Sequence, residues 1–224
     1  MDSRFHLGKY SILTPDSLYQ VDIGSVDFMD RNLVLKDIYY RPVDGIYGLL
    51  RKLPYQTEAV TARIDAVRLM ELDPLSYLES NSIKAMDLTV EGPEIDLFRD
   101  KRHPFDSAAI RPMPQHLLEN AGINADLISL RVRDGRVRYF EFAEKGMMPG
   151  MVSFHRLNMD MAPFYLRTKS QEYPLDQLRI GLEAYIMDTS KVNLDAVMYF
   201  EEKYPMDVSV RMEGFYFGEV NDFF

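Results

Sequence analysis

The residues best placed for chemistry are carboxylates spaced two apart in a strand-like segment. The segment GPEIDLFRDKRHPFD contains Glu94 and Asp96, followed by Asp100 and Asp106. In a strand, residues i and i+2 share one face, so Glu94 and Asp96 are spaced for acid–base catalysis or for binding a cation. A solvated strand face explains the same spacing more simply, because exposed carboxylates are common. No catalytic partner for these two carboxylates can be named from the sequence. The sequence therefore favours a solvent-exposed strand face over a catalytic site.

Motifs for other chemistry are absent. His6, His103, His116 and His155 lie far apart, with no HExxH or HxH spacing, and the chain has no cysteine. The sequence also lacks GxSxG, SxxK with its supporting elements, and both kinds of glycine-rich phosphate loop. We therefore predict a non-enzymatic protein with no metal site and no cofactor. A hydrolase whose catalytic residues come together from distant loops is the least favoured of three hypotheses for the function.

Composition narrows the possible partners. The 224 residues have a formal net charge of −9, and the basic residues are dispersed, which opposes binding to nucleic acid phosphates. Hydrophobic residues make up 46% of the chain, enough for a folded core. We expect one β-rich domain over residues 1–224, since all-β domains often reach this length, and we expect it to be a section of a longer protein.

The N-terminal segment MDSRFHLGKYSILTPDSLYQ has neither the basic start and apolar run of a signal peptide nor the apolar length of a membrane span. Taken as written, this predicts a soluble chain that is not exported. A piece cut from a longer exported or anchored protein would give the same pattern.

Two-residue alternation of apolar side chains dominates the chain and predicts roughly ten to twelve strands. Val21 and Ile23 alternate with polar residues, and Val26 and Phe28 resume with the opposite parity, which predicts a bulge or bend at Gly24-Ser25. Short helices are expected at Tyr47–Leu53, Asp73–Asn81, Met113–Asn120 and Pro174–Leu178. None is long enough for repeated βαβ crossovers, so we expect an elongated, largely antiparallel curved sheet.

The segment from Leu127 to Phe164 has the strongest local signal. Ile128, Leu130 and Val132 alternate with polar residues, and the pair Asp134-Gly135 is typical of a type I′ turn. Val137 and Tyr139 then resume the alternation. This pattern predicts a β-hairpin that turns at Asp134-Gly135.

Methionine-rich strand faces are a second feature. The chain has fourteen methionines and no tryptophan; Leu157, Met159 and Met161 share one strand face, and Met206 and Met212 flank two valines on another. Flexible thioethers can adapt to ligands of variable shape, including acyl chains. Filling of an ordinary core explains the same pattern, and we favour it on sequence grounds alone.

Three segments resemble the AsmA-like and TamB-like envelope proteins of Gram-negative bacteria. They are LYQVDIGSVDFMDRNLVLKDIYYRP, VTARIDAVRLMELDPLSYLESNSIKAMDLTVEGPEIDLFRDK and SLRVRDGRVRYFEFAEKGMMPGMVSFHRLNMDM. The second is similar to that family's strand, short helix and strand with a P-x-I-x-L/I-F/Y ending. The third is similar to its hairpin with Gly-x-(Val/Ile)-x-Tyr, a loop containing Pro-Gly, and a strand rich in Val and Phe. The resemblance covers roughly residues 17 to 165.

The resemblance implies a periplasmic domain, anchored to the inner membrane in the full-length protein, which acts in lipid transport or outer-membrane homeostasis. The implied partner is a phospholipid or another acyl lipid held in an open groove. This sequence departs from the family in its short length and in lacking the anchor helix, as an N-terminal periplasmic section would. The expected lipid-contacting residues are Leu130, Val132, Val137, Tyr139, Leu157, Met159, Met161, Val208, Val210 and Met212.

The main alternative is a structural or protein-interaction β-sandwich with no lipid ligand. In that case a second sheet would cover the apolar face, and function would reside in an exposed edge or loop. Alternation along the strands is the same for a face covered by lipid and for one covered by protein.

Overall fold

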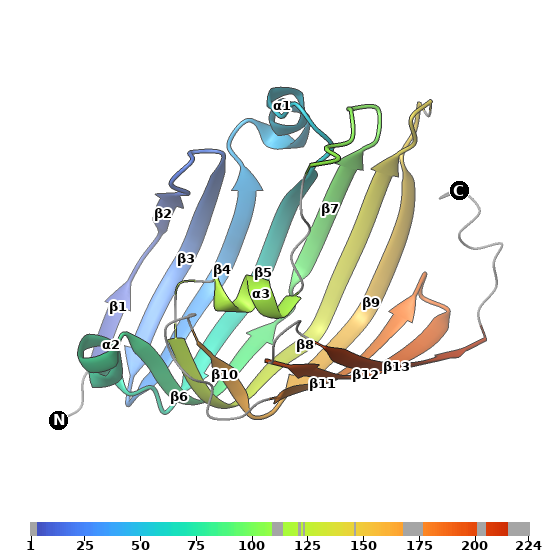
Figure 1. Ribbon diagram of the computed structural model, residues 1–224. Coiled ribbons are helices and arrows are strands. Elements are labelled where there is room, and N and C mark those ends of the chain that lie inside the picture. The colour runs from blue at the N-terminus through green and yellow to red at the C-terminus, as the bar shows by residue number, and fades with distance from the viewer. Residues whose placement is uncertain are drawn as a thin grey trace.

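A computed structural model describes residues 4–108, 114–120, 122, 124–145, 147–167, 177–200 and 205–214. Within these ranges, thirteen strands form one curved and mostly antiparallel sheet (Figure 1). The predicted fold class, a mainly β chain with an elongated curved sheet and short helices between strands, is confirmed.

The elements follow one another along the chain with short connections. The strands are β1 (Arg4–Leu7), β2 (Tyr10–Leu13), β3 (Tyr19–Met29), β4 (Asn32–Pro42), β5 (Glu58–Met70), β6 (Ser82–Glu91), β7 (Glu94–Asp100), β8 (Asn124–Phe142), β9 (Gly150–Met161), β10 (Phe164–Leu166), β11 (Gln177–Ile186), β12 (Ser190–Tyr199) and β13 (Met206–Glu213). The helices are α1 (Gly45–Lys52), α2 (Pro74–Ser80) and α3 (Pro114–Glu119).

The order of strands in the sheet follows their order in the sequence, as expected when neighbours are joined by short connections. Strands β1 and β2 both pair with β3 at one edge, and β13 forms the other edge. Strands β6 and β7 share one position between β5 and β8, and both run parallel to β8. The chain must therefore return along the sheet between β7 and β8, and α3 lies in this return segment.

The helices largely match their predicted positions. At α2, the Asp73 carboxylate accepts a hydrogen bond of 3.1 Å from the Leu75 N–H, Pro74 is the first helical residue, and Asn81 ends the helix with φ 49°. Residues 174–176 of the fourth predicted helix lie outside the described ranges, and Gln177 and Leu178 belong to β11. None of the described helices is long and apolar enough to cross a membrane.

The hairpin predicted at Asp134-Gly135 is wrong. Strand β8 continues through both residues, and the chain reverses instead in the segment 143–149, between β8 and β9. A type I′ turn needs positive φ at both central residues, whereas here only Asp134 has it, at 51°. The two residues form a bulge, where the register between β8 and β9 shifts. Gly135 is buried there, and a Cβ at this position would lie 3.3 Å from Pro93 Cγ.

The bulge in β8 belongs to a row of irregular positions that crosses the sheet. In the β3–β4 ladder, Ile23 pairs with Ile38 and Ser25 with Lys36, but Gly24 and Asp37 between them form no pair. Asp37 has φ 52°, and a Cβ on Gly24 would lie 2.8 Å from Asp37 Cβ. The same interruption continues through Asp65, Gly92 and Asp134. The bend predicted at Gly24-Ser25 is therefore confirmed.

The irregular positions reset the alternation of side chains. One extra residue in a strand lets the residues on either side of it point to the same face of the sheet. A second irregular position lies at Ile128 in β8, which forms no pair with β6. Leu127 and Leu130 pack in one cluster there although they are three residues apart, and Ile128 between them is exposed. Apolar side chains therefore stay on one face around each bend.

Two clusters of buried side chains can be distinguished, and further buried residues, such as Ala184, Ile186 and Val192, lie on β11 and β12. One contains Leu127, Phe164 and Leu178, with Leu118 of α3 packed against it. The other lies under α1 and contains Leu49, Leu50 and Ala59. In Figure 1, α3 lies inside the curve of the sheet, and β11, β12 and β13 turn toward the same side. The two clusters thus lie at different ends of the sheet, and neither spans its whole width.

The glycine at the bend between β6 and β7 should be essential for stability. Gly92 has φ 56°, and a Cβ there would lie 2.2 Å from an Asp65 carboxylate oxygen. We expect Gly92→Ala to lower the free energy of unfolding by about 1–3 kcal/mol, because it adds both backbone strain and a clash. Urea unfolding monitored by circular dichroism measures this change.

Gly8→Ala is the matched control, since nothing lies within 4 Å of a Cβ at that position. We expect this variant to unfold like the unchanged chain. Equal losses in the two variants would mean that the bend does not depend on glycine.

Candidate binding face

Two rows of directly paired residues run across the whole sheet, and every member is apolar. The first row is Phe5, Phe28, Leu33, Leu69, Leu88, Leu130, Met161, Ile180, Ala196 and Val208. The second row is Leu7, Val26, Leu35, Val67, Val90, Val132, Met159, Leu182, Leu194 and Val210. Directly paired residues point to the same face of a sheet, so each row is continuous.

The apolar face continues beyond the row of bends. A third row consists of Ile12, Val21, Tyr40, Ala62, Ile95, Val137, Phe154 and Ile186. A shorter row joins Val60, Leu97, Tyr139 and Val152. The four rows cover most of the length of the central strands.

Much of this face lacks a covering layer among the described residues. Residues of the rows in the middle of the sheet are mostly half-buried, which is the burial expected from neighbours on the same face alone. At the two edges, Phe5 is 52% exposed and Val210 is 55% exposed. Helix α3 and the cluster around Leu127 cover one end (Figure 1). The remainder is an open apolar surface on a curved sheet.

All ten residues predicted to contact lipid are placed on this face by the strand pairing. Seven of them belong to the first three rows, Tyr139 lies in the fourth, and Met212 pairs with Val192 beside Val210. Leu157 pairs with Gly135 at the bend. The prediction missed the contribution of β3 to β7, where Val26, Leu35 and Val67 have the same signal of alternation.

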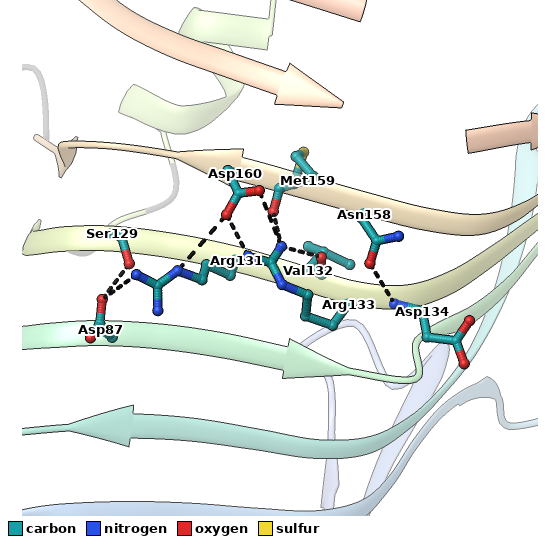
Figure 2. Close-up of polar contacts among 9 residues, drawn as sticks. All are labelled: Asp87, Ser129, Arg131, Val132, Arg133, Asp134, Asn158, Met159 and Asp160. Carbon is teal, nitrogen blue, oxygen red and sulfur yellow. Dashed lines mark hydrogen bonds and ion pairs between the residues drawn. The ribbon is translucent and has the colours of Figure 1, made fainter. Parts of the chain in front are cut away.

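Over β6, β8 and β9 the opposite face is polar and is linked by ion pairs (Figure 2). Near α1 that face also carries the stacked rings of Phe98 and Phe140. Asp160 on β9 accepts hydrogen bonds from both terminal nitrogens of Arg133, at 2.5 Å and 3.3 Å, and its Oδ1 lies 3.8 Å from Arg131 Nε. Arg131 also lies 3.4 Å from Asp87, which accepts a hydrogen bond from the Ser129 hydroxyl. These contacts connect β6, β8 and β9 on the side away from the apolar rows.

Two of the carboxylates singled out from the sequence, Glu94 and Asp96, also lie on the polar face. Glu94 is 3.7 Å from Arg136, and Asp96 makes two bonds of 2.7 Å to Arg138. Both arginines lie on the neighbouring strand, β8. Each carboxylate therefore has a cross-strand partner of opposite charge, as is common on a solvated strand face.

Histidines do not assemble into a metal site within the described ranges. His6 lies 2.6 Å from Asp27, whereas His155 contacts Ser153 at 2.8 Å and Asp188 at 3.3 Å. The side chain of His116 lies outside the described residues. No group of three or more potential ligands that could hold a metal ion occurs among the residues described.

A charged rim ends the apolar face beside β7 and β8. The Tyr139 hydroxyl donates a hydrogen bond of 2.8 Å to Glu141, whose other oxygen lies 2.6 Å from Lys101 Nζ. Arg99, paired in register with Glu141, lies 3.1 Å from Glu58. Cations and carboxylates thus alternate along this rim, next to the fourth apolar row.

The contacts within the rim also shift the pKa values of Tyr139 and Glu141. Burial and the hydrogen bond to Glu141 raise the pKa of Tyr139 to about 12. Burial alone would raise the pKa of Glu141, but hydrogen bonds from Lys101 and Tyr139 outweigh it and lower that pKa. Tyr139 therefore remains a hydrogen-bond donor, and Glu141 remains an anion, at neutral pH.

No protein-family model matches this sequence, and no curated protein matches it either.

Removing the Tyr139 hydroxyl should have an effect that depends on pH. We expect Tyr139→Phe to lower the free energy of unfolding at pH 7 by about 1 kcal/mol through loss of the bond to Glu141. Because the pKa is raised in the folded chain from 10.0 to about 12, this contribution is present below pH 10 and disappears as pH rises through about 12. Urea unfolding at several pH values measures the difference between the two proteins.

The exposed Tyr55 provides the control. Tyr55→Phe should leave stability nearly unchanged across the same range. A loss in Tyr139→Phe that stayed constant up to pH 12 would show that the hydroxyl does not contribute through its protonated form.

Proposed function

We propose that the chain is a non-enzymatic lipid-binding domain whose apolar face holds acyl chains. The observation that supports this proposal is the pair of apolar rows that cross all ten positions of the sheet without a polar residue. Soluble proteins seldom expose a contiguous apolar surface of this kind unless it binds something. Acyl chains suit the face because burial of apolar area contributes about 25 cal/mol per Å² and requires no matching polar group.

The rim and the methionines support an amphipathic ligand. The apolar rows end at the charged rim, which consists of Arg99, Lys101, Glu58 and Glu141. The headgroup of a lipid could therefore remain near these charges while its acyl chains lie on the apolar face. Met159 and Met161 lie in the middle of the rows, where flexible side chains adapt to chains of different shape. A phospholipid or another acyl lipid satisfies both requirements.

The resemblance to AsmA-like and TamB-like proteins extends the proposal to a cellular role. On this view the chain is a periplasmic section of a longer protein that is anchored to the inner membrane, and it acts in lipid transport or outer-membrane homeostasis. An open curved sheet with one apolar and one polar face is the arrangement that such a role requires, because lipid can enter from the side.

Lipid retention after gentle purification tests the proposal. We expect native mass spectrometry of the chain, purified from bacterial cells without detergent, to detect bound phospholipid. Val90→Asp should abolish this signal, because it places a carboxylate in the second apolar row between Val67 and Val132.

Thr89→Asp is the matched control on the same strand. Thr89 pairs with Arg68 and Arg131 on the polar face, so an added carboxylate there has favourable neighbours. This variant should retain lipid, and circular dichroism should show that both variants are folded.

A chain without lipid, under conditions in which a known carrier retains it, would contradict the proposal. That result would favour the alternative of a structural or protein-interaction domain with no lipid ligand. Equal lipid retention in the two aspartate variants would show that lipid binds elsewhere.

A further inference from the structure

The two edges of the sheet differ in how well they are protected from further pairing. At one edge, β1 and β2 have four residues each and are separated by Gly8 and Lys9. Short, interrupted edge strands with lysine are a common defence against unwanted pairing. At the other edge, β13 is an unbroken strand of eight residues, all exposed. Among the residues described, β13 pairs with β12 alone.

The sequence of β13, MDVSVRME, is complementary to itself when two copies run antiparallel about Ser209. In that register, Val208 of one copy lies opposite Val210 of the second, and Met206 lies opposite Met212. Asp207 of each copy lies opposite Arg211 of the other, so the symmetric arrangement contains two such charge pairs. Apolar residues therefore meet apolar residues, and opposite charges meet across the polar face.

The existing pairs of β13 assign these residues to faces. Val208 and Val210 pair with Ala196 and Leu194 in the apolar rows, so Asp207, Ser209 and Arg211 lie on the polar face. Asp207 already accepts a hydrogen bond of 3.0 Å from the Tyr199 hydroxyl, which holds it near the edge. A two-fold axis perpendicular to the sheet keeps both apolar faces on the same side.

We propose that two copies of this chain associate through antiparallel pairing of their β13 strands about Ser209. The interface is isologous and closed, so it forms a dimer and leaves the protected β1–β2 edges outside. Both apolar rows then continue from one copy into the other, which doubles the length of the apolar face. The pairing needs no lipid and is independent of the function proposed above.

Charge reversal tests the register directly. Asp207→Arg places like charges opposite each other at two symmetric positions, and Arg211→Asp does the same with carboxylates. We expect each single variant to raise the dissociation constant of the dimer by roughly tenfold or more. The double variant D207R/R211D restores both pairs and should dimerise like the unchanged chain, as measured by sedimentation velocity over a range of concentrations.

Mixing the two single variants provides a further check. In a mixed dimer, both arginines of one chain lie opposite both aspartates of the other, so heterodimers should form where neither variant forms homodimers. Native mass spectrometry distinguishes the two chains. A non-specific loss of folding in either variant would give no such recovery.

A cysteine at the symmetry axis tests the geometry by a separate route. The chain has no cysteine, and directly opposed residues of an antiparallel pair lie about 4.5–5.5 Å apart at Cα, within reach of a disulfide. Ser209→Cys should form a covalent dimer under mild oxidation. Met212→Cys, exposed on the same strand, should not, because the two copies of residue 212 lie far apart in this register.

A chain that stays monomeric at all accessible concentrations would overturn the proposal. So would failure of the double variant to restore the dimer, or equal cross-linking at positions 209 and 212. Open filaments that grow with concentration would indicate head-to-tail pairing of β13 with the β1–β2 edge, and would also overturn it.

Discussion

The apolar residues of a strand that change parity can stay on one face only if an irregular position adds a residue between them, and this constraint governs the sheet from β3 to β9. Without the extra residue, strict alternation would send Val26 and Phe28 to the face opposite Val21 and Ile23. The bends at Gly24, Asp37, Asp65, Gly92 and Asp134 form one row, so neighbouring strands are interrupted at the same level and their pairing resumes beyond it. Curvature and a continuous apolar face thus have the same origin.

A face that no other described segment covers over most of its area changes how such a sheet is stabilised. The two buried clusters lie around Leu127 and under α1, so strands β3 to β8 between them depend largely on their hydrogen-bonded ladders and on side chains that cover one another across strands. The ion pairs of the polar face, such as Arg133 with Asp160, are partly exposed, and each contributes little by itself. Their more important effect is on register, because a slip by one residue would place arginines among the apolar rows.

Local patterns in the sequence were sufficient for most elements, but not for the bends in β8 or for the pairing of β6 and β7. Alternation located the strands, and Asp73-Pro74 with Asn81 located α2, since these signals depend on a few neighbouring residues. Asp134-Gly135 suits both a turn and a bulge, and the choice depends on Pro93 and Leu157, which are distant in sequence. The parallel pairing with β8 likewise follows from the return of the chain through α3, which no local pattern encodes. The ten predicted contact residues share one face, yet the full face also includes the earlier strands.

The arrangement of the rows favours a particular direction for any long apolar ligand. Along the strands, the apolar surface ends at the rim of Glu141 and Lys101 on one side and at the cluster beneath α3 on the other. Across the strands, the rows from Phe5 to Val208 and from Leu7 to Val210 contain no polar residue. With neighbouring strands about 4.8 Å apart, ten strand positions provide an apolar path of roughly 45 Å. Four members of the first row, Leu88, Leu130, Met161 and Ile180, pack against that cluster, so the second row is the more open path. An acyl chain lying along the second row would cross no charged group, whereas one lying along a strand would meet the rim. The bends that shape the sheet would therefore also orient an acyl ligand of the kind proposed above.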